Sequence, residues 1–284
     1  MDPLIVAQTL NFAYAVISLL LVVLGLAVTL GWLGVMNLAH GEFVMLGAYV
    51  AVVTERMGWP FWAAIPLTIL FCIVLGIVVE RLLIRPLYSR PFDLLLATWG
   101  LSILIRKIVE AAFGGGYISL TVPVKGSLDI LGASYPTYRI LIMAFTVALL
   151  AMLLAWYFRS SAAARVKAMV GNPMLAQAVG IDTNALARNT FVVGTCLAGL
   201  AGVIIAPVTS VNPFLGLDYV INAFFVIIVG GLGSVLGLFA GSGIIGGLDS
   251  FVSAILDRTS AFFLVLLIAI FFLWLRPRGL FARN

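Results

Sequence analysis

Charged residues are scarce in this chain of 284 residues, at 10% of the sequence, whereas an average soluble domain carries about 25%. Hydrophobic residues make up 63%, and the mean hydropathy is +1.21. These proportions exclude an ordinary soluble protein and predict an integral membrane protein. The apolar segments reach the length of about 20 residues that a spanning helix needs, and they lack the ~10-residue alternation of barrel strands.

Cysteine, histidine and lysine are also rare. Cys72 and Cys196 both fall inside apolar segments, so their positions favour neither a disulfide framework nor a metal site. The only histidine has one acid near it in sequence, which is too few ligands to hold a metal ion. None of the three lysines follows a glycine, so the chain has no phosphate-binding Gly-x-x-x-x-Gly-Lys-Ser/Thr loop. We therefore expect no catalytic residues, metal or cofactor in this chain, and any nucleotide energy must come from another subunit.

The apolar segments predict an all-α, polytopic bundle of about eight to ten transmembrane helices, forming one domain over residues 1–284. About nine spans are expected, at 5–30, 41–55, 61–82, 93–112, 139–158, 189–208, 219–233, 234–252 and 260–275. Glycines interrupt the sequence before Gly41 and around Gly230, so we expect broken helices there.

The cations between the spans predict an orientation. Ten of the sixteen Lys and Arg residues fall in alternate loops, which places all ten on one side of a nine-span protein. Because cytoplasmic loops carry the excess of Lys and Arg, the N-terminus is expected outside and the C-terminus inside. The largest outside element is then the loop at 113–138, whose Gly, Pro, Ser and Thr content favours irregular or short extended structure.

One long polar interruption, residues 159–188, falls on the cytoplasmic side. Its sequence predicts a short helix over residues 162–170, a break at Asn172 and Pro173, and a second helix over 174–179 that ends at Gly180. Its apolar residues are mostly small alanines, whereas a helix bound to the membrane surface favours bulky apolar anchors and dense Lys and Arg. We therefore favour a protein-docking element over a plain amphipathic connector.

Two places within the apolar sequence carry polar chemistry. The first holds Asn37, His40 and Glu42 within six residues, which favours either a broken helix lining a pathway or a set of side chains that satisfy one another and hold the break. The second lies in the fourth span, where Arg106 and Glu110 are spaced to pair on one helical face. Thr98, Trp99 and Ser102 in the same span are the better candidates there for substrate contact.

Five segments carry a family resemblance. They read GWLGVMNLAHGEFVMLGAY, ERLLIRPLYSRPFDLLLATWGLSILI, VKAMVGNPMLAQAVGIDTNALA, VNPFLGLDYVINAFFVIIVGGLGSVLG and LWLRPRGLF. Together they resemble the membrane permease of branched-chain amino acid ABC importers, a hydrophobic amino acid and amide uptake family that includes urea permeases. The likeness covers nearly the whole chain and implies a multi-pass permease of the inner (plasma) membrane.

The resemblance also implies partners and roles. The partners would be a second permease, related or a copy of this chain, two cytoplasmic subunits that bind ATP and Mg²⁺, and an external substrate-binding protein. The ATPase-coupling residues carried over are Asn172, Pro173, Met174, Gln177, Gly180 and Ile181, and residues 37–42 would border the translocation route. Branched-chain amino acids rank first as substrate and urea or a short amide second. An ion-coupled secondary transporter, using His40 and Glu42, is the alternative from another class.

Overall fold

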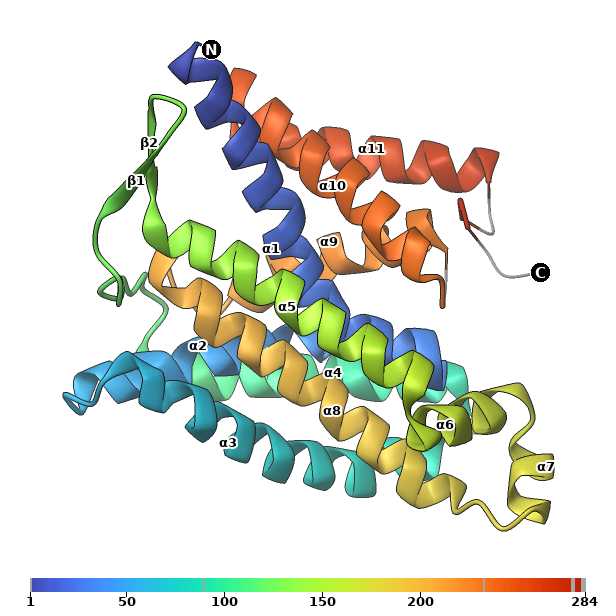
Figure 1. Ribbon diagram of the computed structural model, residues 1–284. Helices are drawn as coiled ribbons and strands as arrows, with labels where there is room; N and C mark the ends of the chain where they lie inside the picture. Colours follow the sequence, from blue (N-terminus) through green and yellow to red (C-terminus); the bar gives the residue numbers. More distant parts are fainter. Residues whose placement is uncertain (1, 89, 232, 277–278, 282–284) are drawn as a thin grey trace. The chain divides into compact units, whose positions relative to one another are not determined.

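The computed structural model describes residues 2–281 apart from 89, 232, 277 and 278, and it is mostly helical (Figure 1). Its internal packing divides the chain into two compact units, which are described separately. Unit 1 comprises residues 1–23, 121–147 and 221–284, and unit 2 comprises residues 24–120 and 148–220.

Long helices form at all nine expected spans. They are α1 (Pro3–Leu33), α2 (His40–Arg56), α3 (Ala64–Val79), α4 (Pro91–Phe113), α5 (Thr137–Arg159), α8 (Thr183–Ile205), α9 (Leu215–Gly230), α10 (Val235–Ile255) and α11 (Arg258–Leu275). Single turns flank two of them, at η1 (Phe61–Ala63), η2 (Glu80–Ile84), η3 (Arg85–Leu87) and η4 (Ala206–Val208). The largest boundary error is at α8, expected from residue 189. It begins six residues earlier because the Asp182 side chain caps it, accepting a hydrogen bond of 2.9 Å from the Ala185 N–H.

Five of these segments are long and apolar enough to cross a membrane without help. They are Pro3–Leu33, Phe61–Leu87, Thr137–Arg159, Thr183–Val208 and Val235–Ile255, and α9 and α11 are shorter apolar helices. The other two long helices carry more charge: α2 has Glu42, Glu55 and Arg56, and α4 has Asp93, Arg106, Lys107 and Glu110. The expected polytopic helical architecture is confirmed, and the two polar spans belong to the same unit.

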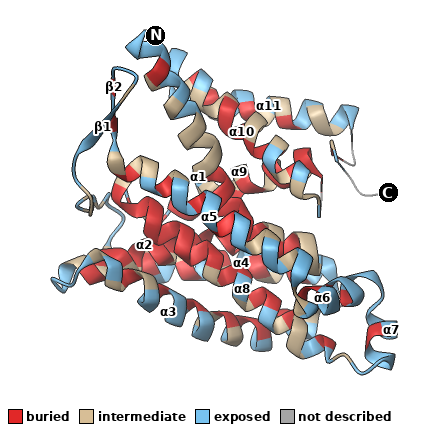
Figure 2. Cartoon of the chain, in the orientation of Figure 1, coloured by how far each residue is buried: buried red, intermediate tan, exposed pale blue. Residues whose placement is uncertain are grey.

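Unit 2 is built around α2 and α8, whose residues are mostly buried (Figure 2). Glycines bring the backbones into direct contact: a Cβ at Gly47 would overlap the carbonyl of Gly199, and one at Gly202 would overlap that of Val44. In a membrane such small residues let helices approach closely and gain van der Waals contact. This dense contact fixes α2, and with it the polar residues at its start.

The chain breaks where glycine predicted it. After α1, Gly34 has a φ of +68°, and residues 34–39 separate α1 from α2. After α9, Gly231 and Gly233 have φ of +101° and +74° before α10 begins. These values lie in the left-handed region that glycine adopts without steric cost, which is why both helices end there.

The expected outside loop contains a β-hairpin within unit 1. Strands β1 (Ser127–Ile130) and β2 (Ala133–Pro136) pair antiparallel, with Leu131 and Gly132 both at positive φ in the turn. The Asp129 carboxylate accepts a hydrogen bond of 2.8 Å from the Gly132 N–H and so stabilises the turn. The prediction of short extended structure in residues 113–138 is therefore confirmed.

The two short helices of the polar interruption also form. They are α6 (Ser161–Gly171) and α7 (Pro173–Ala178), within a residue or so of the expected bounds. Both belong to unit 2, and they lie at the end of α5 and before α8 (Figure 1).

Candidate transport site and coupling element

The break between α1 and α2 is held by its own polar groups. The Asn37 Oδ1 accepts a hydrogen bond of 3.0 Å from the Ala39 N–H, which turns the chain into the first turn of α2. The Leu38 N–H donates to Thr98 Oγ1 at 3.2 Å, which attaches the break to α4. Asn37 and Thr98 are both fully buried. Sequence reasoning therefore selected two residues that lie together, and their shared role in this structure is to fix a non-helical backbone.

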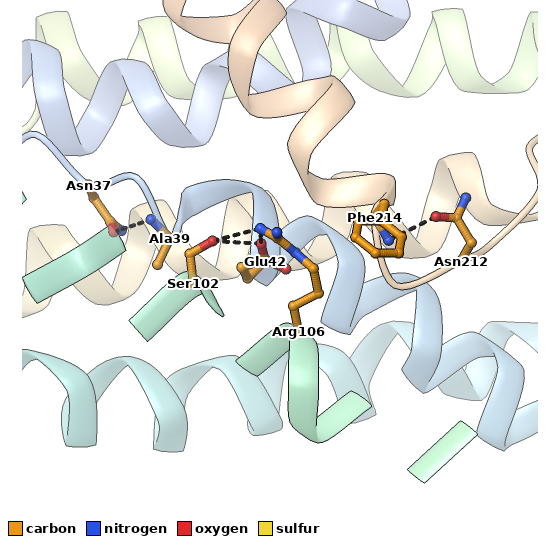
Figure 3. Close-up of polar contacts among 7 residues, drawn as sticks. All are labelled: Asn37, Ala39, Glu42, Ser102, Arg106, Asn212 and Phe214. Carbon is orange, nitrogen blue, oxygen red and sulfur yellow. Dashed lines mark hydrogen bonds and ion pairs between the residues drawn. The ribbon is translucent and has the colours of Figure 1, made fainter. Parts of the chain in front are cut away.

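Glu42, in the first turn of α2, forms the centre of a buried polar cluster (Figure 3). Its Oε1 accepts a hydrogen bond of 2.8 Å from Ser102 Oγ and one of 2.6 Å from Arg106 Nη2. Arg106 Nη2 also donates to Ser102 Oγ at 3.0 Å, which closes the triangle. The side chains of Glu42 and Arg106 are only 2% and 13% exposed, so this is a desolvated ion pair that needs each of its partners.

The cluster extends to the turn before α9. The guanidinium carbon of Arg106 lies 5.6 Å from the centre of the Phe214 ring, within the range of a cation–π interaction. The Phe214 N–H donates to Asn212 Oδ1 at 2.8 Å, which holds that turn in shape (Figure 3). Gly216 follows it and contacts Gly41 so closely that a Cβ on either residue would overlap the backbone of the other. Three separated stretches of sequence thus meet at the start of α2.

The structure differs from the expected side-chain pairing in two places. Arg106 pairs with Glu42 and not with Glu110, which instead accepts a hydrogen bond of 2.7 Å from Lys107 Nζ. The reason is desolvation: a buried carboxylate needs a buried cation, whereas Glu110 has solvent available. Asn37 and Glu42 also do not bond to each other, because Asn37 bonds to its own backbone and Glu42 bonds to α4.

His40 and Glu42 point to different neighbours. Residues two apart on a helix do not share a face, and the His40 ring lies toward α1 and α8, where a Cβ at Gly25 would come within 2.9 Å of its Cε1. Trp99 also differs from the cluster residues of α4: it is 55% exposed, whereas Thr98 and Ser102 are buried. The structure therefore brings together four of the six predicted pathway residues, namely Asn37, Glu42, Thr98 and Ser102.

A second buried acid was not singled out from the sequence. Glu80 is 1% exposed and accepts a hydrogen bond of 3.4 Å from the Tyr88 hydroxyl, across the turns η2 and η3. A carboxylate between an apolar span and three arginines reads in the sequence as an interfacial residue. The burial of Glu80 becomes visible only in the tertiary structure.

The candidate coupling element, α6 and α7 with the turn at Gly180 (called the coupling element below), has well-defined helix ends. The Ser160 Oγ accepts from the Ala162 N–H at 3.1 Å, and the Asn172 Oδ1 accepts from the Leu175 N–H at 3.0 Å, so each helix has a side-chain N-cap. Pro173 occupies the first position of α7, where a missing N–H has no cost. Gly180 has a φ of +83° and ends the element. The roles expected of Pro173 and Gly180 in the backbone are confirmed.

The two sides of the coupling element differ in exposure, although both carry apolar residues. On the inner side, Met169 and Ala176 are buried with Ala187, and Leu33, Tyr88, Ile181 and Leu186 pack against them. On the outer side, Met174 is 81% exposed, Leu175 61% and Val179 69%. Of the predicted coupling residues, Ile181 therefore faces inward, and Gln177 donates to Thr183 Oγ1 at 2.8 Å within the unit. Sequence reasoning missed Leu175 and Val179, which are apolar residues between polar or small ones.

Within the part of the chain that the structure describes, no three His, Cys, Asp or Glu side chains come together in a way that could hold a metal ion. The thiols of Cys72 and Cys196 are both free.

Comparison with known proteins agrees with this architecture. Residues 8–275 match the family model described as branched-chain amino acid transport system / permease component. The chain is 29% identical to the high-affinity branched-chain amino acid transport system permease protein LivH of Escherichia coli K12, over 97% of this chain and 93% of that one. It is 27% identical to the permease protein BraD of Pseudomonas aeruginosa, over 100% and 96% of the two chains. It is also 27% identical to a probable LivH of Methanocaldococcus jannaschii, over 83% and 78%.

No solved structure matches the chain. A permease component of an ABC system is the transport subunit and not the ATPase, and it implies ATPase and binding-protein partners. Because the family model covers nearly the whole sequence, this chain belongs to the permease-component family of branched-chain amino acid transport systems and is a multi-pass membrane protein.

Proposed function

We propose that this chain carries branched-chain amino acids across the inner membrane into the cell, driven by ATP hydrolysis in separate subunits. The observation that carries the proposal is the exposure of three apolar residues on the otherwise polar coupling element. They are Met174, Leu175 and Val179. Contiguous exposed apolar residues on a polar element mark a protein interaction site. The chain has no phosphate-binding loop of its own, so a partner that docks there would supply the energy.

The inner side of the coupling element suggests how a push would reach the spans. Leu33 is the last residue of α1, directly before the break, and it packs against the same cluster as Tyr88 and Leu186. Displacement of α7 would therefore act on the end of α1, on the connection between α3 and α4, and on the start of α8. Packed elements of this kind switch between discrete arrangements, which is what alternating access requires.

We also propose that the start of α2 borders the translocation route. Asn37, His40 and Glu42 are buried there, and ionisable residues inside a membrane protein usually face a partner or a pathway. Thr98 and Ser102 join them from α4, and we place Trp99 beside the same route on the exposed side of that helix. The ion pair between Glu42 and Arg106 speaks against an ion-coupled transporter, because the carboxylate already has a fixed cation.

The proposed orientation places the N-terminus outside and the C-terminus in the cytoplasm. The coupling element and the connection at 80–90 then face the cytoplasm, and the β-hairpin faces outside. The proposed assembly holds a second permease, related or identical, two cytoplasmic ATP-binding subunits and one external binding protein.

The test is transport by the assembled importer in proteoliposomes, with leucine uptake and ATP hydrolysis measured together. Replacing Met174 or Leu175 by Asp should reduce leucine uptake and its stimulation of ATP hydrolysis by about tenfold or more, because a charge in an apolar contact is costly. Leu128→Asp is the matched control, since Leu128 is 50% exposed on the outside hairpin.

Unchanged substrate-stimulated hydrolysis in both coupling variants would refute the docking role. Uptake of urea without uptake of leucine by the unmodified importer would instead refute the substrate assignment.

A further inference from the structure

Unit 1 contains a cavity of about 660 Å³ between α1, α5 and α10. Next to it α1 and α10 approach closely: a Cβ at Gly246 would come within 3.2 Å of the Ala15 backbone, and one at Gly247 within 2.6 Å of the Phe12 ring. The volume falls within the range of roughly 300–1,000 Å³ that is typical of small-molecule sites.

One wall of the cavity presents a positioned guanidinium. Arg139, at the start of α5, donates from Nη1 to Asn11 Oδ1 at 3.0 Å, and its guanidinium carbon lies 5.0 Å from the centre of the Tyr14 ring. A guanidinium has five N–H donors in a planar fork, so these contacts orient it and leave donors for a ligand. The planar fork matches the geometry of a carboxylate.

Another wall presents the opposite charge. Asp249 on α10 lines the same cavity, with the hydroxyls of Ser250 and Ser253 beside it. A cavity with a guanidinium on one helix and a carboxylate on another is complementary to a ligand that carries both charges. Urea carries neither charge, and an amine or an acid carries only one.

The rest of the lining is apolar. Phe12 and Ala15 from α1 and Phe251 from α10 contribute hydrocarbon surface next to the charged groups. This combination suits an amphipathic molecule whose charged end is small and whose other end is aliphatic. On the proposed orientation the cavity also lies toward the outer side, where substrate arrives.

We propose that this cavity is a binding site for a zwitterionic amino acid with an aliphatic side chain, in which Arg139 binds the carboxylate, Asp249 binds the ammonium group, and Phe12 and Phe251 contact the side chain. The inference rests on the proposed function, since it assigns that function a substrate site in the permease itself.

The test measures binding of labelled leucine to the purified full chain in lipid nanodiscs, with two leucine analogues as competitors. 3-Methylbutylamine lacks the carboxylate, and 4-methylpentanoate lacks the ammonium group. Each should bind the unmodified chain about 10- to 100-fold more weakly than leucine, because each loses one charge-assisted interaction.

The variants should change these preferences selectively. Arg139→Gln should remove the preference for leucine over 3-methylbutylamine and keep the preference over 4-methylpentanoate. Asp249→Asn should do the reverse. A residue with only a structural role would not exchange one preference for the other.

Lys125→Gln and Asp257→Asn are the matched charge controls, because both residues are exposed in unit 1 and neither lines the cavity. Both should keep both preferences. Arg139→Lys and Asp249→Glu keep the charges, so they should retain both preferences more weakly. These two variants test the site if the neutral variants do not fold.

Three results would overturn the site. They are wild-type preferences in both neutral variants, equal binding of leucine and the two analogues to the unmodified chain, and no leucine binding by the chain although the assembled importer takes up leucine. The last of these would leave the proposed function intact, whereas an importer that carries urea and not leucine would refute that function.

Discussion

Glu42 and Arg106 are 64 residues apart in sequence, yet Glu42 Oε1 on α2 lies 2.6 Å from Arg106 Nη2 on α4. The pair joins the two long helices that are too polar to cross a membrane on composition alone. Each helix therefore neutralises the charge of the other, and Ser102 and Phe214 complete the surroundings. The pair therefore stabilises unit 2 and also fixes the start of α2, which borders the proposed route.

Removing one member of this pair should destabilise the protein strongly. Arg106→Met leaves the Glu42 carboxylate buried without its cation, at a cost of about 3–5 kcal/mol. The double variant Glu42→Met, Arg106→Met should recover most of that loss, since no unpaired charge remains. Thermal unfolding of the purified chain in detergent measures both effects.

The control for that experiment is Lys107→Met, which breaks the neighbouring pair with Glu110. Because the side chains of that pair are 67% and 32% exposed, its loss should cost no more than about 1 kcal/mol. Equal losses for Arg106→Met and Lys107→Met would contradict the assignment of the first as a buried pair.

The contact between α2 and α8 should tolerate no side chain at Gly47. Gly47→Ala places a Cβ against the backbone of Gly199, so the helices must separate, and we expect a loss of several kcal/mol or failure to fold. Gly100→Ala is the matched control within α4, because a Cβ there meets nothing within 4 Å. It should be neutral or stabilise by up to about 1 kcal/mol. Expression level and unfolding temperature distinguish the two, and a tolerated Gly47→Ala would show that this contact is looser than described.

The N-cap of α7 should control the order of the coupling element. Asn172→Ala removes the acceptor for the Leu175 N–H and should cost about 1 kcal/mol of local stability. Asn172→Asp keeps an acceptor and should behave like the unmodified chain. Hydrogen exchange at Leu175, measured with leucine-stimulated ATP hydrolysis in the assembled importer, should show faster exchange and weaker stimulation in the Ala variant alone. The same exchange rate in all three proteins would argue against a role for this cap.

The local stability of the first turn of α11 should depend on pH in the acid range. Hydrogen bonds from Ser260 and Thr259 lower the pKa of Asp257, which caps the helix, below its ordinary value of 3.8. A lowered folded-state pKa means that the cap contributes stability above pH 3.8 and that this contribution is lost as the pH falls through the folded value. Hydrogen exchange at Thr259 and Ser260 should therefore lose protection only as the pH falls below 3.8. Asp257→Asn keeps an N-cap without a titrating group, so its protection should not change over this range. A parallel loss in that variant would rule out titration of Asp257 as the cause.

Much of the architecture could be predicted from local sequence. Runs of apolar residues determine where helices span, and Gly34, Gly231 and Gly233 end helices through their own backbone freedom. Asn172 caps α7 through the Leu175 N–H, three residues away, so the start of α7 follows from a short-range pattern. The family match over residues 8–275 confirmed the resemblance carried by the same stretches.

The sequence by itself therefore determined that this is a polytopic helical permease, where its helices break, and that the polar interruption at 159–188 forms two short helices. Only the tertiary structure decided which charges meet. Arg106 had a local partner available in Glu110 but pairs with Glu42, because burial makes an uncompensated carboxylate far more costly than an exposed one. The tertiary structure likewise decided that Arg139 and Asp249, from helices distant in sequence, line one cavity. Contacts between side chains on different helices depend on how those helices pack. Packing involves segments far apart in the chain, so a local sequence pattern does not contain it.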